Sequence, residues 1–215
     1  MIRTLRTTLA ATALLLTFTT AWADTSDSVK ALQADWAQAM YQYSGNAKEQ
    51  ALEKLADKAR KQAEASAKDA DTLIWEGIVL GSYAGAKGGL GALGLVKEAK
   101  AAFEKAISID PKALDGSALT SLGSLYYQVP GWPLGFGDDE KAEQYLKKGL
   151  TINPNGIDPN YFYGDFLFRK GRYNEAEAAL TKALAAPARP GRELADQGRR
   201  GEIDALLTKV RAKRG

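Results

Sequence analysis

Residues 117–154 read SALTSLGSLYYQVPGWPLGFGDDEKAEQYLKKGLTINP, the layout of one helical hairpin with an insertion at its tip. A small residue at Gly123 lets the second helix approach closely, and Ala142 plays the reciprocal role. The large residues expected around this contact are Leu119, Leu122, Tyr126 and Leu146. Pro154 ends the hairpin, because proline lacks a backbone donor and keeps its predecessor out of the helical region. The segment therefore predicts two antiparallel helices in close contact.

The same layout occurs on both sides of this segment. The corresponding residues are Gly77, Ala99 and Phe103 upstream, and Gly164, Ala176 and Leu180 downstream. Asp158-Pro159 predicts the start of the downstream hairpin, with Asp158 as N-cap and proline at the first helical position. Residues 25–43 and 47–68 each carry apolar residues on one helical face, and they predict a degenerate N-terminal hairpin.

The hairpins differ in the spacing between their paired small residues. Gly164 and Ala176 are 12 positions apart, Gly123 and Ala142 are 19 apart, and Gly77 and Ala99 are 22 apart. Relative to the last hairpin, the first carries an insertion of about 10 residues (22 minus 12) and the middle one an insertion of about 7 (19 minus 12). The upstream insertion is rich in glycine, and residues 85–88 are expected to be loop. Both insertions leave at equivalent turns, and insertions on one face of a repeat array are often where binding occurs.

The middle insertion combines turn residues with three large apolar side chains, Trp132, Leu134 and Phe136. Two alternatives follow from this composition. The side chains tuck back onto the helices and enlarge the core, or they contact a ligand or partner, since exposed apolar groups mark interaction sites.

The C-terminal segment 193–214 predicts a final helix that covers the last hairpin, with a break near Gly198 or Gly201. Its basic residues are interpreted as a solvated face of this cap. They are Arg199, Arg200, Lys209, Arg211, Lys213 and Arg214.

Residues 1–23 have the pattern of an export signal. Arg3 and Arg6 precede an apolar run, and Ala21-Trp22-Ala23 fits a cleavage site before Asp24. The alternative, a transmembrane anchor, needs an apolar run of about 18 to 20 residues. With no cysteine in the chain, cysteine acylation and disulfides are excluded. We therefore expect a periplasmic protein with no membrane span after cleavage.

The remaining composition excludes several classes of protein. Loss of Arg3 and Arg6 leaves 27 basic residues against 26 acidic ones, and this near-neutral balance argues against nucleic acid as a partner. The chain has no histidine and no cysteine, which removes most hydrolytic triads, thiol chemistry and nearly all zinc sites. No catalytic residue, cofactor or metal is predicted.

Two motifs are weighed and rejected. Residues 89–94 read GLGALG, a G-x-G-x-x-G match, but the preceding segment has helical rather than strand spacing, so a dinucleotide site is not expected. Asp138, Asp139 and Glu140 precede a helix and are interpreted as an N-cap and first turn rather than a calcium site.

Over roughly residues 70–188 these patterns resemble the tetratricopeptide-repeat family, whose signature is W-x2-L-G-x2-Y, A-x3-F and P. The resemblance implies an all-α, right-handed solenoid of helical hairpins. We divide it into an N-terminal hairpin (24–69), repeats at 70–114, 115–157 and 158–188, and a cap (189–215). It also implies a concave face that binds peptides or other partners. By position, the residues of that face are Ile74, Ile78, Thr120, Ser124, Tyr127, Tyr161, Asp165, Phe168 and Arg169.

Within that family, G-W-P-x-G-F-G-D-D-x-x-K-A-E resembles exported proteins related to the T-component of TRAP transporters. This second resemblance implies association with a periplasmic substrate-binding protein and a small apolar ligand, although the chain lacks a lipoprotein cysteine. Two functions stay open: a non-catalytic protein-interaction module, and an accessory component of a TRAP-type transport system. The residues predicted to bind are Tyr127, Trp132, Phe136, Tyr161, Asp165, Phe168 and Arg169.

Overall fold

The computed structural model describes residues 26–214, and these form nine helices with no strand among them. Their bounds are α1 (Asp27–Tyr41), α2 (Gly45–Ala65), α3 (Ala70–Lys87), α4 (Ala92–Ile109), α5 (Ala113–Gln128), α6 (Asp139–Ile152), α7 (Ile157–Arg169), α8 (Tyr173–Leu184) and α9 (Glu193–Arg214). The all-α hairpin solenoid is confirmed. The predicted export signal lies outside the described residues.

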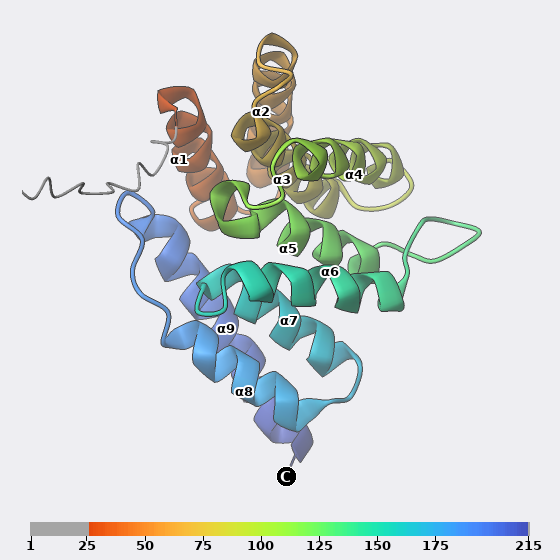
Figure 1. Ribbon diagram of the computed structural model, residues 1–215, viewed down its shortest axis with the longest axis vertical. Coiled ribbons are helices and arrows are strands. Elements are labelled where there is room, and N and C mark those ends of the chain that lie inside the picture. The colour runs from red at the N-terminus through yellow and green to blue at the C-terminus, as the bar shows by residue number, and fades with distance from the viewer. Residues whose placement is uncertain (1–25, 215) are drawn as a thin grey trace, which may run out of the picture.

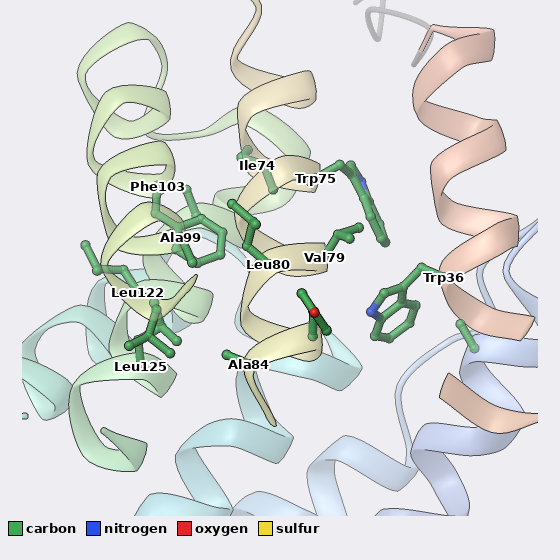
Figure 2. Close-up of a cluster of buried hydrophobic side chains, with 14 of the residues drawn as sticks. Trp36, Ile74, Trp75, Val79, Leu80, Ala84, Ala99, Phe103, Leu122 and Leu125 are labelled. Atoms are coloured by element: carbon green, nitrogen blue, oxygen red, sulfur yellow. The ribbon is translucent and has the colours of Figure 1, made fainter. Parts of the chain in front are cut away.

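The predicted close contacts between paired helices are present in three hairpins, α3/α4, α5/α6 and α7/α8. A methyl group added to Gly123 would lie 2.8 Å from the Leu146 side chain and 3.2 Å from the Ala142 carbonyl oxygen. At Gly164 it would lie 2.7 Å from Leu180, and at Gly77 it would lie 2.5 Å from Phe103. The contacts below 3.0 Å would force the facing side chain to move, so glycine permits the close approach of the helices at each of these positions. Figure 2 shows Phe103 and Ala99 of α4 facing the apolar residues of α3.

The odd-numbered helices form a closed ring. Each contacts the next along the series α1, α3, α5, α7 and α9, and α9 also contacts α1. Figure 1 shows α9 beginning on the α1 side of the molecule and running along α8. The even-numbered helices pack on the outside of this ring. The predicted C-terminal cap is thus confirmed, and it covers α8 while also meeting the first helix.

Ring closure depends on a close approach of α1 and α9. The ring of Tyr41 lies where a methyl group on Gly198 would sit, 2.3 Å from Cδ1. The expected break of the last helix is therefore wrong: α9 continues through Gly198 and Gly201. Gly198 serves to admit the tyrosine ring rather than to end the helix.

The end of α3 and the start of α7 also differ from expectation. α3 continues through Gly85 to Lys87, so much of the upstream insertion lengthens the hairpin helices and the connecting loop is short. α7 begins at Ile157 with Gly156 as N-cap, so Asp158 is not the N-cap. By contrast, Asp138 caps α6 as predicted, because its carboxylate accepts from the backbone N–H groups of Glu140 and Lys141.

The start of α5 has an unusual backbone. Leu114, Asp115 and Gly116 have φ of 45°, 56° and 73°, the left-handed region that is costly for residues other than glycine. This turn places Leu114 and Asp115 at the central cavity described next.

Candidate functional site

The ring of odd-numbered helices encloses a cavity of about 940 Å³. Its lining comes almost entirely from α1, α3, α5, α7, α9 and the segments that follow α6 and α8. This volume is within the range of about 300 to 1,000 Å³ that small-molecule sites occupy. Six of the nine residues implied for the concave face line it: Ile78, Thr120, Ser124, Tyr161, Asp165 and Arg169.

An ion cluster joins α7 to the C-terminal segment at one side of the cavity. Asp158 accepts from Arg189 at 2.7 Å and from Arg199 at 2.8 Å. Arg189 also pairs with Asp196 at 2.6 Å, and Arg199 pairs with Glu202 at 2.5 Å. Burial alone would raise the pKa of Asp158, but the guanidinium groups of Arg199 and Arg189 outweigh it and lower this pKa to about 2. These contacts explain why Asp158 does not cap α7.

The interpretation of the last helix's basic residues as a solvated face holds for Lys209, Arg211, Lys213 and Arg214, which are exposed, and is wrong for Arg199 and Arg200. Arg199 is only 8% exposed, and its guanidinium lies 4.3 Å from the centre of the Tyr161 ring. Arg200 donates to the carbonyl oxygens of Leu184 and Ala186. Both arginines face inward because α9 approaches α1 and α7 so closely, and they hold the cap in place rather than covering a solvated face.

The predicted binding residues divide into four places. Tyr127, Asp165 and Arg169 form one cluster on α5 and α7: the Tyr127 hydroxyl donates to Asp165 at 2.9 Å, and Arg169 donates to the same oxygen at 3.1 Å. Burial, followed by the charge of Asp165, raises the pKa of Tyr127. Tyr161 belongs to the ion cluster. Phe168 packs on Tyr173 of α8 with ring centres 5.8 Å apart, and it does not line the cavity.

The fourth place is the middle insertion, residues 129–138. Phe136 tucks back and meets Tyr126 edge to face, with ring centres 5.6 Å apart. Trp132 is 90% exposed and Leu134 is 64% exposed. The two alternatives for this loop therefore apply to different residues, and neither Trp132 nor Phe136 lines the cavity.

The loop is shaped by its own backbone. Gly137 N donates to the Pro130 carbonyl at 2.9 Å, and Leu134 N donates to the Gly131 carbonyl at 3.1 Å. A methyl group on Gly137 would lie 2.0 Å from the Val129 carbonyl oxygen. The two limbs of the loop thus approach so closely that only glycine fits, and they hold Trp132 away from the helices.

Sequence reasoning did not identify a second group of cavity residues, Trp75 of α3 and Arg192 before α9. The Arg192 guanidinium lies 5.0 Å from the centre of the Trp75 ring. Trp36 of α1 meets Trp75 edge to face at 5.8 Å, and Figure 2 shows the two indoles between their helices. Arg192 stands between two predicted elements and belongs to no periodic pattern, so no sequence signal pointed to it.

The described part of the chain contains no cluster of histidine, cysteine, aspartate and glutamate that could hold a metal ion. Among residues 26–214, no helix has both the length and the apolar character of a membrane span.

These features define a helical-hairpin repeat protein with a ring-shaped inner layer and a projecting apolar loop. Residues 134–193 and residues 90–113 match family models described as tetratricopeptide repeat. These two segments of the chain therefore resemble tetratricopeptide repeats, and the resemblance is confirmed over them.

The remaining comparisons add little. No curated protein matches the chain. A crystal structure of MamA is 18% identical, covers 76% of this chain and 89% of its own, and gives a TM-score of 0.44. A crystal structure of MamA protein is 17% identical, covers 87% and 93% respectively, and gives a TM-score of 0.44. The resemblance to TRAP T-components stays a prediction.

Proposed function

We propose that this protein is a non-catalytic interaction module that binds a protein partner through the loop of residues 129–138. Tetratricopeptide repeats support a protein-interaction role in general. The observation that carries the proposal is the exposure of Trp132, 90%, on a loop whose conformation is fixed by hydrogen bonds and a glycine contact. Tryptophan is enriched at the centres of protein interfaces, and a fixed loop loses little entropy on binding.

Photo-crosslinking tests this proposal. A photoreactive amino acid is placed at Leu134, beside Trp132, and as a control at Lys148 on the exposed side of α6. We expect a discrete cross-linked product from position 134 alone. Excess unlabelled wild-type protein should abolish the product, whereas excess Trp132→Ala protein should not. Equal competition by both proteins would contradict a role for Trp132.

We also propose that the protein acts in the periplasm after cleavage between Ala23 and Asp24. The pattern of residues 1–23 supports this localisation. Cell fractionation followed by N-terminal sequencing tests it. A periplasmic product beginning at Asp24 is expected, and a cytoplasmic product that retains Met1 would contradict the proposal.

A second candidate function is that of a ligand-binding accessory of a TRAP-type transport system, with a periplasmic substrate-binding protein as the partner. The observation that favours it is the partly open cavity of about 940 Å³ between the odd-numbered helices, which a simple interaction scaffold does not need. Under this candidate, the product cross-linked at position 134 should be a substrate-binding protein. Identification of the product by mass spectrometry separates the two candidates.

A further inference from the structure

One arginine of the cavity, Arg192, forms no direct ion pair among the described residues, although the charges of Asp158 and Asp196 act on it. Arg189 forms ion pairs with Asp158 and Asp196, and Arg199 forms ion pairs with Asp158 and Glu202. No ion pair or hydrogen bond joins the Arg192 side chain to any residue in the part of the chain that the structure describes. Burial, followed by the charge of Arg189, lowers the pKa of Arg192. A partly buried guanidinium that makes no direct ion pair is costly to retain for packing alone.

Unused hydrogen-bond donors accompany this charge. Arg192 Nε and Trp75 Nε1 are both buried and have no partner within residues 26–214. Trp75 is 3% exposed as a whole and lines the cavity together with Arg192. Buried donors are nearly always satisfied in folded proteins, so two neighbouring unsatisfied donors beside a cavity indicate a missing acceptor.

The cavity lining is mixed, and it includes apolar side chains of α1 and α3. Trp36 and Met40 of α1 and Ile78 of α3 line the same cavity. The indole nitrogen of Trp36 is already satisfied, because it donates to the Ser82 hydroxyl at 2.8 Å. Lys48 of α2 also lines the cavity, and no ion pair joins it to the other described residues. The cavity therefore offers an occupant both the positive charge of Arg192 and apolar surface from α1 and α3.

We propose that the cavity binds a small organic acid, whose carboxylate accepts from Arg192 and from Trp75 Nε1 and whose apolar body lies against Trp36, Met40 and Ile78. Arginine pairs with carboxylates through two parallel hydrogen bonds, a geometry that the Nε edge of the guanidinium provides. The proposal depends neither on the protein partner of the external loop nor on a role in transport.

Calorimetric titration with 4-phenylbutyrate and its neutral amide, 4-phenylbutyramide, tests the charge requirement. The acid should bind wild-type protein at least about tenfold more tightly than the amide. Arg192→Gln should abolish this preference, and Arg192→Lys should keep part of it. Arg211→Gln is the matched control, because Arg211 lies outside the cavity and pairs with Glu177. Equal binding of acid and amide, no binding of the acid, or an unchanged preference in Arg192→Gln would overturn the proposal.

Proton–nitrogen NMR of the indole groups tests the location. Addition of 4-phenylbutyrate should shift the Trp75 indole N–H signal and leave that of Trp132 unchanged, with Trp→Phe variants for assignment. A shift confined to Trp132 would place the acid outside the cavity.

The same titration is done with a tripeptide that has a free C-terminal carboxylate and with its C-terminal amide. This second comparison is needed because the C-terminus of a protein also carries a carboxylate. If the protein binds the peptide acid more tightly than the peptide amide but binds phenylbutyrate and its amide equally, the assignment to a small acid is overturned.

Discussion

The aromatic ring of Tyr41, at the last residue of α1, lies against the backbone of Gly198 in α9. A methyl group at Gly198 would come within 2.3 Å of the ring. The two residues are far apart in the sequence and belong to the first and last helices. Their contact converts a linear series of hairpins into a closed ring, and it therefore bears on stability and on the cavity.

Substitution of Gly198 by alanine should open this contact. Overpacking of a well-packed site costs about 1 to 3 kcal/mol, and we expect a loss of that size in the free energy of unfolding. Gly201→Ala in the same helix is the control, because a methyl group there has no atom within 4 Å. That variant should gain about 0.5 to 1 kcal/mol from helix propensity. Urea titrations of both variants check the prediction, and shifts of the same sign would contradict it.

The ion cluster predicts a pH dependence. The pKa of Asp158 falls from 3.8 to about 2 on folding, so the folded state favours the ionised carboxylate. The resulting stabilisation, about 2 kcal/mol, is complete above about pH 4 and is lost as the pH falls toward 2. Asp158→Asn should be less stable than wild type at pH 7, and the difference should shrink over this interval. Denaturation curves at several pH values check this, and parallel profiles for the two proteins would rule it out.

The glycine contact of the middle hairpin predicts two damaging substitutions. Gly123→Leu and Ala142→Leu each force a large side chain into the α5/α6 contact and should cost about 1 to 3 kcal/mol or more. Lys213→Gln, on an exposed residue of the last helix, should leave the melting temperature unchanged. Thermal melts followed by circular dichroism provide the measurement. Unchanged midpoints for both leucine variants would mean that these residues are not in close contact.

In the loop of residues 129–138, we expect substitutions of Trp132 and Phe136 to differ in their effect on stability. Trp132→Ala should leave stability unchanged, because the side chain is almost fully exposed. Phe136→Ala should lower the free energy of unfolding by at least about 1 kcal/mol, because it removes the edge-to-face contact with Tyr126. Equal effects of the two substitutions on the urea midpoint would contradict this division of the loop.

The contacts between the two helices of a hairpin could be predicted from the sequence. The closure of the ring by α1 and α9 could not. Gly123, Ala142 and their counterparts repeat at comparable positions, so their contacts follow from the hairpin pattern. The contact between α1 and α9 occurs once, between distant segments, and Gly198 was interpreted as a helix break because a single glycine carries no sign of its neighbour. Arg199 and Arg192 were missed for the same reason, since their inward orientation depends on where closure places the last helix.

Closure also sets the number of hairpins. In an open array each repeat contacts only its neighbours, so duplication or loss of a unit during evolution leaves the others intact. In this chain an additional hairpin would carry Gly198 away from Tyr41, and a missing one would bring α9 into collision with α1. The closed ring therefore fits only this number of hairpins, whereas a change in length of the loops outside the ring leaves the contact between Tyr41 and Gly198 in place.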